Sequence, residues 1–264
     1  MIVAIHQPCF LPWLGYLDRM ARADLFVLLD HVQFERANYQ NRTRIRARSG
    51  TPGGGHEARW LTVPVLQRSQ KERIDEKEID NGGEGPRHWS VVALNTLRHA
   101  YRDAPYADRY LPALRDLLAL RWTRLADLNE ALLGVLRDAF AITTPLVRSS
   151  SLGVRGAKAE LVLDICRAVG ATTFLGGMGG SRGYVDAATF AEAGVRVVWQ
   201  DFRHPVHRQC GATPFIPGLS SLDLLFNCGP MGRSLFLEED RWESPKPSSP
   251  APSPLATPAA PSWR

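Results

Sequence analysis

Polar side chains follow directly after the first two apolar segments of the sequence. Residues 1–5 (MIVAI) lead into His6 and Gln7, and residues 25–29 (LFVLL) lead into Asp30. Short continuous apolar runs of this kind predict buried strands of a parallel sheet. A histidine at a strand end suits general acid–base chemistry or hydrogen bonding to an oxyanion near neutral pH. We therefore expect His6, Gln7 and Asp30 to form the catalytic centre, with Asp30 orienting His6 or binding a hydroxyl.

A proline-stiffened loop, HQPCFLPW, separates the first expected strand from a helix expected over residues 14–23. Pro8 and Pro12 each fix one backbone dihedral and remove one hydrogen-bond donor, so the loop has few conformations. Helix N-termini attract phosphate and carboxylate groups, which favours an anion site beside His6. The competing interpretation is a structural loop whose histidine bonds only to backbone. Cys9 is a weaker candidate nucleophile, because the sequence fixes no acid to orient a Cys–His pair.

Much of the positive charge gathers in residues 36–48, RANYQNRTRIRAR, of a chain with formal net charge +5. Alternate residues of a strand share one face, so Arg42 with Arg44 or Arg46 would suit a clamp on a phosphate or carboxylate. Asn41 next to them is a further substrate-binding candidate. The alternatives are a solvated hairpin with ordinary surface arginines, or a nucleic-acid surface. No recognised nucleic-acid motif accompanies the arginines, so a nucleic-acid partner is not expected.

A glycine-rich segment, GGMGGSRGY over residues 176–184, follows a third expected strand. Such loops let backbone N–H groups approach a phosphate, although this one matches neither common phosphate-binding fingerprint. We expect Gly176, Gly177 and Tyr184 to form the wall of the site opposite His6.

The last expected helix, over residues 219–226, brings two more substrate-binding candidates. Asp223 and Asn227 are four residues apart and so share one helix face. The competing interpretation is ordinary helix chemistry, with a serine N-cap and an acidic first turn. His204 and His207 lack a third spaced ligand, so we predict no metal site.

The apolar patterns predict an α/β fold with a mostly parallel, Rossmann-like sheet. The elements that we expect to build it are strands at 1–5, 25–29, 146–149, 172–175 and 195–199 and helices at 14–23, 157–169, 187–193 and 219–226. Strands at 38–47 and 60–65 would form a hairpin, followed by helices at 91–101, 106–119 and 125–140. We expect one domain over residues 1–240, with an insertion at about 38–140. The proline-rich residues 244–264 are expected to be disordered.

Composition fits a soluble globular protein, with 44% apolar and 22% charged residues among 264. The four cysteines are widely spaced, which argues against a zinc ribbon or a disulfide scaffold. The start of the chain lacks the pattern of a signal peptide, and no apolar run approaches the roughly 18 residues that span a bilayer. We expect a cytoplasmic protein without a membrane partner.

Several long motifs resemble the WbqC-like family over roughly residues 1–232. They are HQPCFLPWLGYLDRMARADLFVLLDHVQFERANYQNRTRI, WLTVPV, Leu175-Gly176-Gly177 with Gly183-Tyr184, and PFIPGLSSLDLLFNCGP. The resemblance implies a pathway context more than a reaction, because the family is associated with surface polysaccharide loci, chiefly O-antigen, and with some small-molecule pathways.

The opening is also similar to nucleotidyltransferases of the HIGH type, in which a strand and loop lead into a His-x-Gly-His motif. Here both histidines are replaced, by Trp13 and Tyr16. The similarity marks Tyr16 as a substrate-binding candidate. It does not support standard nucleotidyl transfer, because the histidines that contact the phosphates are missing.

Together these features predict a group-transfer enzyme, a transferase or ligase, of O-antigen, other glycan or small-molecule biosynthesis. Its substrate would be anionic, either a nucleotide-linked sugar or an activated acyl donor, and the sequence identifies no cofactor. The alternative is a non-catalytic protein of the same pathway that binds a sugar nucleotide or acts as a scaffold.

Overall fold

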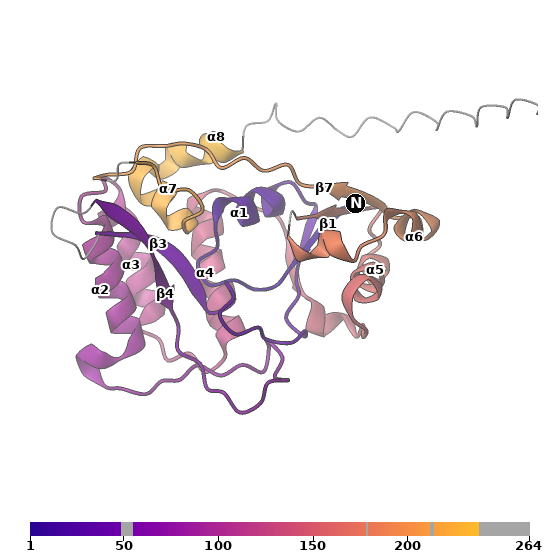
Figure 1. Ribbon diagram of the computed structural model, residues 1–264, viewed down its shortest axis with the longest axis horizontal. Helices are drawn as coiled ribbons and strands as arrows, with labels where there is room; N and C mark the ends of the chain where they lie inside the picture. The colour runs from indigo at the N-terminus through magenta and orange to yellow at the C-terminus, as the bar shows by residue number, and fades with distance from the viewer. Residues whose placement is uncertain (49–54, 178, 212–213, 238–264) are drawn as a thin grey trace, which may run out of the picture.

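The computed structural model describes residues 1–48, 55–177, 179–211 and 214–237 (Figure 1). Its central sheet has five parallel strands in the order β5-β2-β1-β6-β7. The strands are β1 (Ile2–His6), β2 (Leu25–Leu28), β5 (Leu146–Arg148), β6 (Thr173–Gly176) and β7 (Arg196–Trp199). The expected mostly parallel α/β fold is therefore confirmed. The proline-rich segment 244–264 lies outside the described residues.

The middle strand, β1, is where the sheet changes its direction of growth. After β1 the chain adds β2 and β5 on one side, and it then returns to add β6 and β7 on the other. Connections from β1 and β6 thus leave the sheet in opposite directions, which opens a crevice at the carboxyl ends of these two strands. His6 is the last residue of β1, and Gly176 is the last residue of β6.

Alternation along β1 decides which face of the sheet each side chain meets. Val3 and Ile5 belong to the core that includes α5 (Lys158–Ala168) and α6 (Ala187–Glu192). Ala4 belongs to the larger core on the other face, with α1 (Leu14–Ala21). Because side chains of a strand alternate with period two, His6 lies on the same face as Ala4 and meets α1.

The insertion consists of the expected hairpin and helical block. Strands β3 (Arg42–Arg48) and β4 (His56–Thr62) are antiparallel, and they precede α2 (Trp89–Tyr101), α3 (Ala107–Leu118) and α4 (Leu125–Ala139). Figure 1 shows the hairpin lying across these helices. The last helices of the described residues are α7 (Ser221–Cys228) and α8 (Gly232–Phe236). Short 3-10 turns lie at Gly85–Arg87, Ser149–Leu152, Gly180–Gly183 and Gly229–Met231.

Two expected strand bounds were wrong. Residues 38–41 form a turn rather than the start of β3, because pairing with β4 begins at Arg42. The partner strand ends at Thr62 because β4 pairs from His56 to Thr62 with β3. The sequence also gave no indication of α8.

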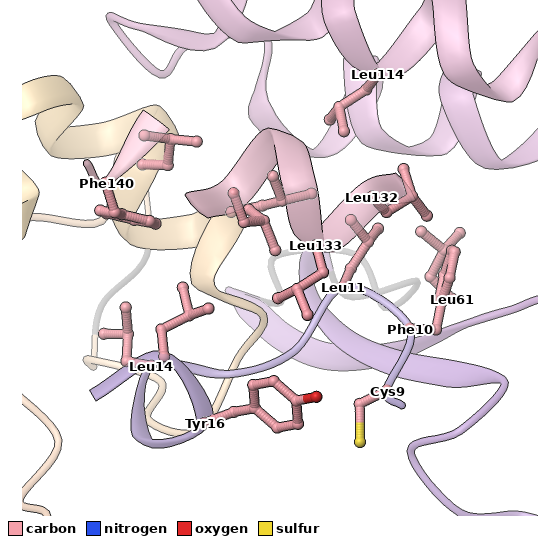
Figure 2. Packing of buried hydrophobic residues seen from close by; sticks show 14 of the residues in the cluster. Cys9, Phe10, Leu11, Leu14, Tyr16, Leu61, Leu114, Leu132, Leu133 and Phe140 are labelled. Atoms are coloured by element: carbon pink, nitrogen blue, oxygen red, sulfur yellow. The ribbon is translucent and has the colours of Figure 1, made fainter. Parts of the chain in front are cut away.

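The loop after β1 joins the sheet to the helical block. Cys9, Phe10 and Leu11 are buried in the larger core, and Figure 2 shows Leu11 beside Leu132 and Leu133 of α4 and Phe10 beside Leu61 of β4. The position of the residues after His6 is thus fixed by packing on both sides. Among the described residues, no helix is long and apolar enough to cross a membrane.

We predict that Gly176→Ala destabilises the protein, because a Cβ at this position would lie 2.5 Å from a ring carbon of Trp199. Overpacking of this kind costs about 1–3 kcal/mol. Gly134→Ala in α4 is the matched control, since a Cβ there meets nothing within 4 Å. It should stabilise the protein by about 0.5–1 kcal/mol. Urea denaturation of both variants tests this, and equal effects of the same sign would contradict it.

Candidate functional site

A cavity of about 310 Å³ opens at the carboxyl ends of β1 and β6. His6 and Gln7 line it from the end of β1, and Gly177 and Tyr184 line it from the glycine-rich segment. These two predicted parts of the site, about 170 residues apart in the chain, therefore face one cavity. We call it the switch-point cavity, since it lies where the sheet changes its direction of growth.

His6 is held as a neutral imidazole. Its Nδ1 lies 2.9 Å from the carbonyl oxygen of Gln7, and a carbonyl only accepts, so Nδ1 carries the proton and Nε2 keeps a lone pair. The Tyr16 ring packs edge-on at 4.8 Å between ring centroids. Burial, and next the positive charge of Arg19, lower the pKa of His6 to about 3. At neutral pH the side chain can accept a proton at Nε2 but has no second proton to donate.

Arg19 is a candidate functional residue that the sequence analysis missed. It belongs to α1, lines the switch-point cavity and is only 4% exposed. Among the described residues its side chain has no hydrogen-bond or ion-pair partner, and Nε is buried without one. Burial lowers its pKa to about 10, which still leaves the guanidinium charged at neutral pH. The positive charge at this cavity thus comes from a side chain rather than from the helix N-terminus expected from the sequence.

The neighbours of Arg19 explain why no described residue forms an ion pair with it. Asp18 is the adjacent carboxylate, but it pairs with Arg22 at 2.7 Å and accepts from Gln200 at 2.6 Å. On the cavity side, a Cβ at Gly177 would overlap with the guanidinium, so any other residue there would force Arg19 to move. A signal for Arg19 was present in the sequence: it lies three residues after Tyr16, so the two share a helix face.

Cys9 and Tyr16 complete the buried surroundings of His6. The Cys9 sulfur lies 3.8 Å from His6 Nδ1, but that nitrogen already bonds to the Gln7 carbonyl. Burial raises the pKa of Cys9 to about 12, so the thiol stays protonated and is a poor nucleophile. Burial likewise raises the pKa of Tyr16 well above its usual value, and its hydroxyl has no partner among the described residues. Figure 2 shows this hydroxyl directed toward Cys9.

A chain of amides forms one wall of the cavity. Gln40, fully buried, donates from Nε2 to Gln7 Oε1 at 2.8 Å and accepts from the backbone N–H of Glu35 at 2.9 Å. Glu35 in turn accepts a 2.6 Å bond from Asn38. Because Gln7 Oε1 is occupied, the NH₂ group of Gln7 is the part of that amide left for a ligand.

Asp30 is buried at the end of β2, but its bonds lead away from the cavity. It accepts from Ser149 Oγ at 3.0 Å and from the backbone N–H and hydroxyl of Ser150 at 2.9 and 2.7 Å. No hydrogen bond joins it to His6 among the described residues. A catalytic role for Asp30 therefore stays a prediction that no contact supports.

The arginines of β3 do not converge on one anion. Arg42 stacks on Trp60, with 3.9 Å between the guanidinium carbon and the ring centroid, and it lines a second cavity together with Asn41. Arg46 is 1% exposed and donates to the carbonyl of Ala100 in α2. The common face predicted for these side chains is thus divided between a cavity and the core.

Asp223 and Asn227 lie in a separate buried cluster on α7. Asp223 accepts from His207 at 2.8 Å and from Gln209 at 2.7 Å, and Asn227 accepts from the backbone N–H of Cys210 at 2.9 Å. Neither residue lines the switch-point cavity or the second cavity. Their bonds tie the segment after β7 to α7.

Comparison with known proteins finds a matching protein family and a related protein. The model of the WbqC-like protein family matches residues 7–234. A protein of Mycobacterium tuberculosis named "Uncharacterized protein Rv1507c" is 32% identical over 229 residues, which cover 86% of this chain and 94% of that protein. No solved structure matches the chain.

We predict that folding stability falls below about pH 6.5 because of His6. The unfolded histidine binds a proton near pH 6.5, whereas the folded one does so only near pH 3. The unfolded state therefore binds more protons between these pH values. As the pH falls through this range, the free energy of unfolding decreases by up to about 1.4 kcal/mol per pH unit. Urea denaturation near pH 7 and pH 5 should show a larger loss for the wild type than for His6→Gln. NMR of the histidine Cε1–H provides a direct check, and a His6 signal titrating near pH 6.5 would contradict this assignment.

Proposed function

The chain belongs to the WbqC-like protein family, and on that premise we propose that it is a group-transfer enzyme of glycan or small-molecule biosynthesis. Its donor substrate carries an anionic group, as in a nucleotide-linked sugar or an activated acyl compound, and this group binds to Arg19. The observation that supports the proposal is a buried guanidinium with no counter-ion among the described residues, at the ligand-binding edge of a doubly wound sheet.

Burial of the Arg19 charge is electrostatically unfavourable. A buried charge without a partner costs several kcal/mol, and a paired anion offsets that cost. The guanidinium offers parallel N–H donors, which match the oxygens of phosphate or carboxylate. Gly177, Gly179 and Gly180 line the opposite side of the cavity, where a glycine-rich backbone lets its N–H groups come close to an anion.

His6 and Gln7 supply the remaining chemistry in this proposal. An anion on Arg19 neutralises a charge that depresses the pKa of His6, so Nε2 becomes a stronger base when the donor is bound. The attacking hydroxyl or amine forms its new bond to the donor while its proton passes to Nε2, and the leaving group departs with the bonding electrons. The free NH₂ of Gln7 is suited to hydrogen-bond an oxygen of the donor.

We predict opposite effects of Arg19→Met on stability and on binding. Without ligand, the variant should be as stable as the wild type or more stable, by about 1–4 kcal/mol, because a buried unpaired charge is removed. With ligand at about a hundred times its dissociation constant, the wild type gains roughly 2.7 kcal/mol, and the variant should gain almost nothing. Thermal-shift measurements with ATP, CTP, UDP- and dTDP-sugars and coenzyme A thioesters, with and without Mg²⁺, test both effects.

Arg167→Met is the matched control, since Arg167 is an exposed arginine of α5 whose ion pair within the described part of the chain is with Asp164. It should keep the full ligand response. A destabilised Arg19→Met variant that still responds to ligand would show that Arg19 is structural. The absence of any response in the wild type would overturn the proposed substrate class, and binding without turnover would favour the non-catalytic alternative.

A further inference from the structure

A second cavity, of about 760 Å³, adjoins the first one. Glu35 lines both cavities. The hydrogen bonds of Gln40 to Gln7 Oε1 and to the Glu35 backbone N–H therefore connect the linings of the two cavities. Nothing in the chemistry derived for the switch-point cavity uses this larger space, which lies between the turn before β3, the end of β4 and the segment after it. We call it the insertion cavity.

Neutral hydrogen-bonding side chains are the most numerous kind in the lining of the insertion cavity, followed by charged ones. The amide and hydroxyl side chains are Gln33, Asn41, Thr62, Gln67, Ser69 and Gln70. The buried Lys77 forms an ion pair with Glu72 at 2.7 Å, which lowers the pKa of Glu72 to about 2. Including these two, the charged residues of the lining are Glu35, Arg36, Arg42, Glu72 and Lys77, so positive and negative charges largely offset one another across the cavity.

Two unpartnered polar atoms lie next to each other in the chain at the edge of this cavity. Asn41 is 8% exposed and donates from Nδ2 to the carbonyl of Val63, which leaves Oδ1 buried without a partner among the described residues. Arg42 donates from Nη2 to the carbonyl of Ala37, and its Nε is likewise buried without a partner there. An acceptor and a donor in the lining of one cavity fit hydroxyl groups, which donate and accept at once.

We propose that the insertion cavity binds a neutral polyhydroxylated compound, held by Asn41 Oδ1 and Arg42 Nε. That this compound is the acceptor substrate of the group transfer rests on the proposed function. Glu35, which lines both cavities, would then lie where the acceptor substrate meets the donor substrate. The binding itself does not depend on that function. A built site rather than a surface depression is indicated by the buried amide oxygen, the Trp60-stacked guanidinium and the size of the cavity.

Saturation-transfer NMR with methyl α-glucoside and myo-inositol at millimolar concentration tests this binding on the full-length protein. Both probes are neutral polyols, and we expect signals for at least one of them with the wild type. Arg42→Met should weaken binding about tenfold, through loss of a hydrogen bond from a charged donor. Arg44→Met is the matched control, because Arg44 is on the same strand but does not line the cavity. It should bind like the wild type.

Asn41→Leu removes the other proposed contact, and Thr62→Val tests the cavity wall with little risk to folding. Weaker binding in Arg42→Met and in either of these variants, with binding kept in Arg19→Met, would support the subsite even if no anionic donor is found. Loss of binding in Arg19→Met alone would place the polyol in the switch-point cavity and overturn the inference. The inference would also be overturned if neither probe gives a signal, or if all variants bind equally.

Discussion

The packing of the loop after β1 against α4 is the contact on which the arrangement of both cavities depends. Phe10 and Leu11 are fully buried in the larger core. The backbone of this loop also bonds to the insertion, because Phe10 N–H donates to the carbonyl of Tyr39 and the Thr43 hydroxyl donates to the carbonyl of Leu11. Asn129 links α4 to the turn before β3 by donating to the carbonyl of Gln40 at 2.8 Å. One short segment thus fixes the strand end, the hairpin and the helical block relative to each other.

A row of aromatic rings runs alongside that contact. His6 packs against Tyr16 and Trp13, Trp13 packs against Tyr39, and Tyr39 packs against Trp60 with 5.4 Å between centroids. These rings separate the polar groups of the two cavities from the apolar core. They also reduce water access around His6, which is why its pKa and that of Cys9 shift so far in the direction of the neutral forms. The same environment strengthens any ion pair made by Arg19.

Local patterns in the sequence predicted most elements of the fold, because each central strand is a short apolar run and each helix has a regular apolar stripe. The same patterns placed His6, Gln7, Gly177 and Tyr184 together, since the carboxyl ends of parallel strands share one edge. What could not be predicted depends on distant partners. The bonds of Asp30 go to serines about 120 residues away, and Arg46 is buried because α2 covers it. Arg19 had a local signal in the sequence, but only the three-dimensional structure shows that no described residue serves as its counter-ion.

The place of Glu35 on the boundary of both cavities has a consequence for how the protein unfolds. The switch-point cavity is lined from the end of β1, from α1 and from the glycine-rich segment, whereas the insertion cavity is lined by residues 33–37 and by residues between 41 and 77 of the insertion. A donor substrate and an acceptor substrate in contact beside Glu35 would form a bridge between the linings of the two cavities. This bridge would add to the apolar core that already joins the sheet to the insertion, so local opening of the hairpin would become rarer in the bound protein.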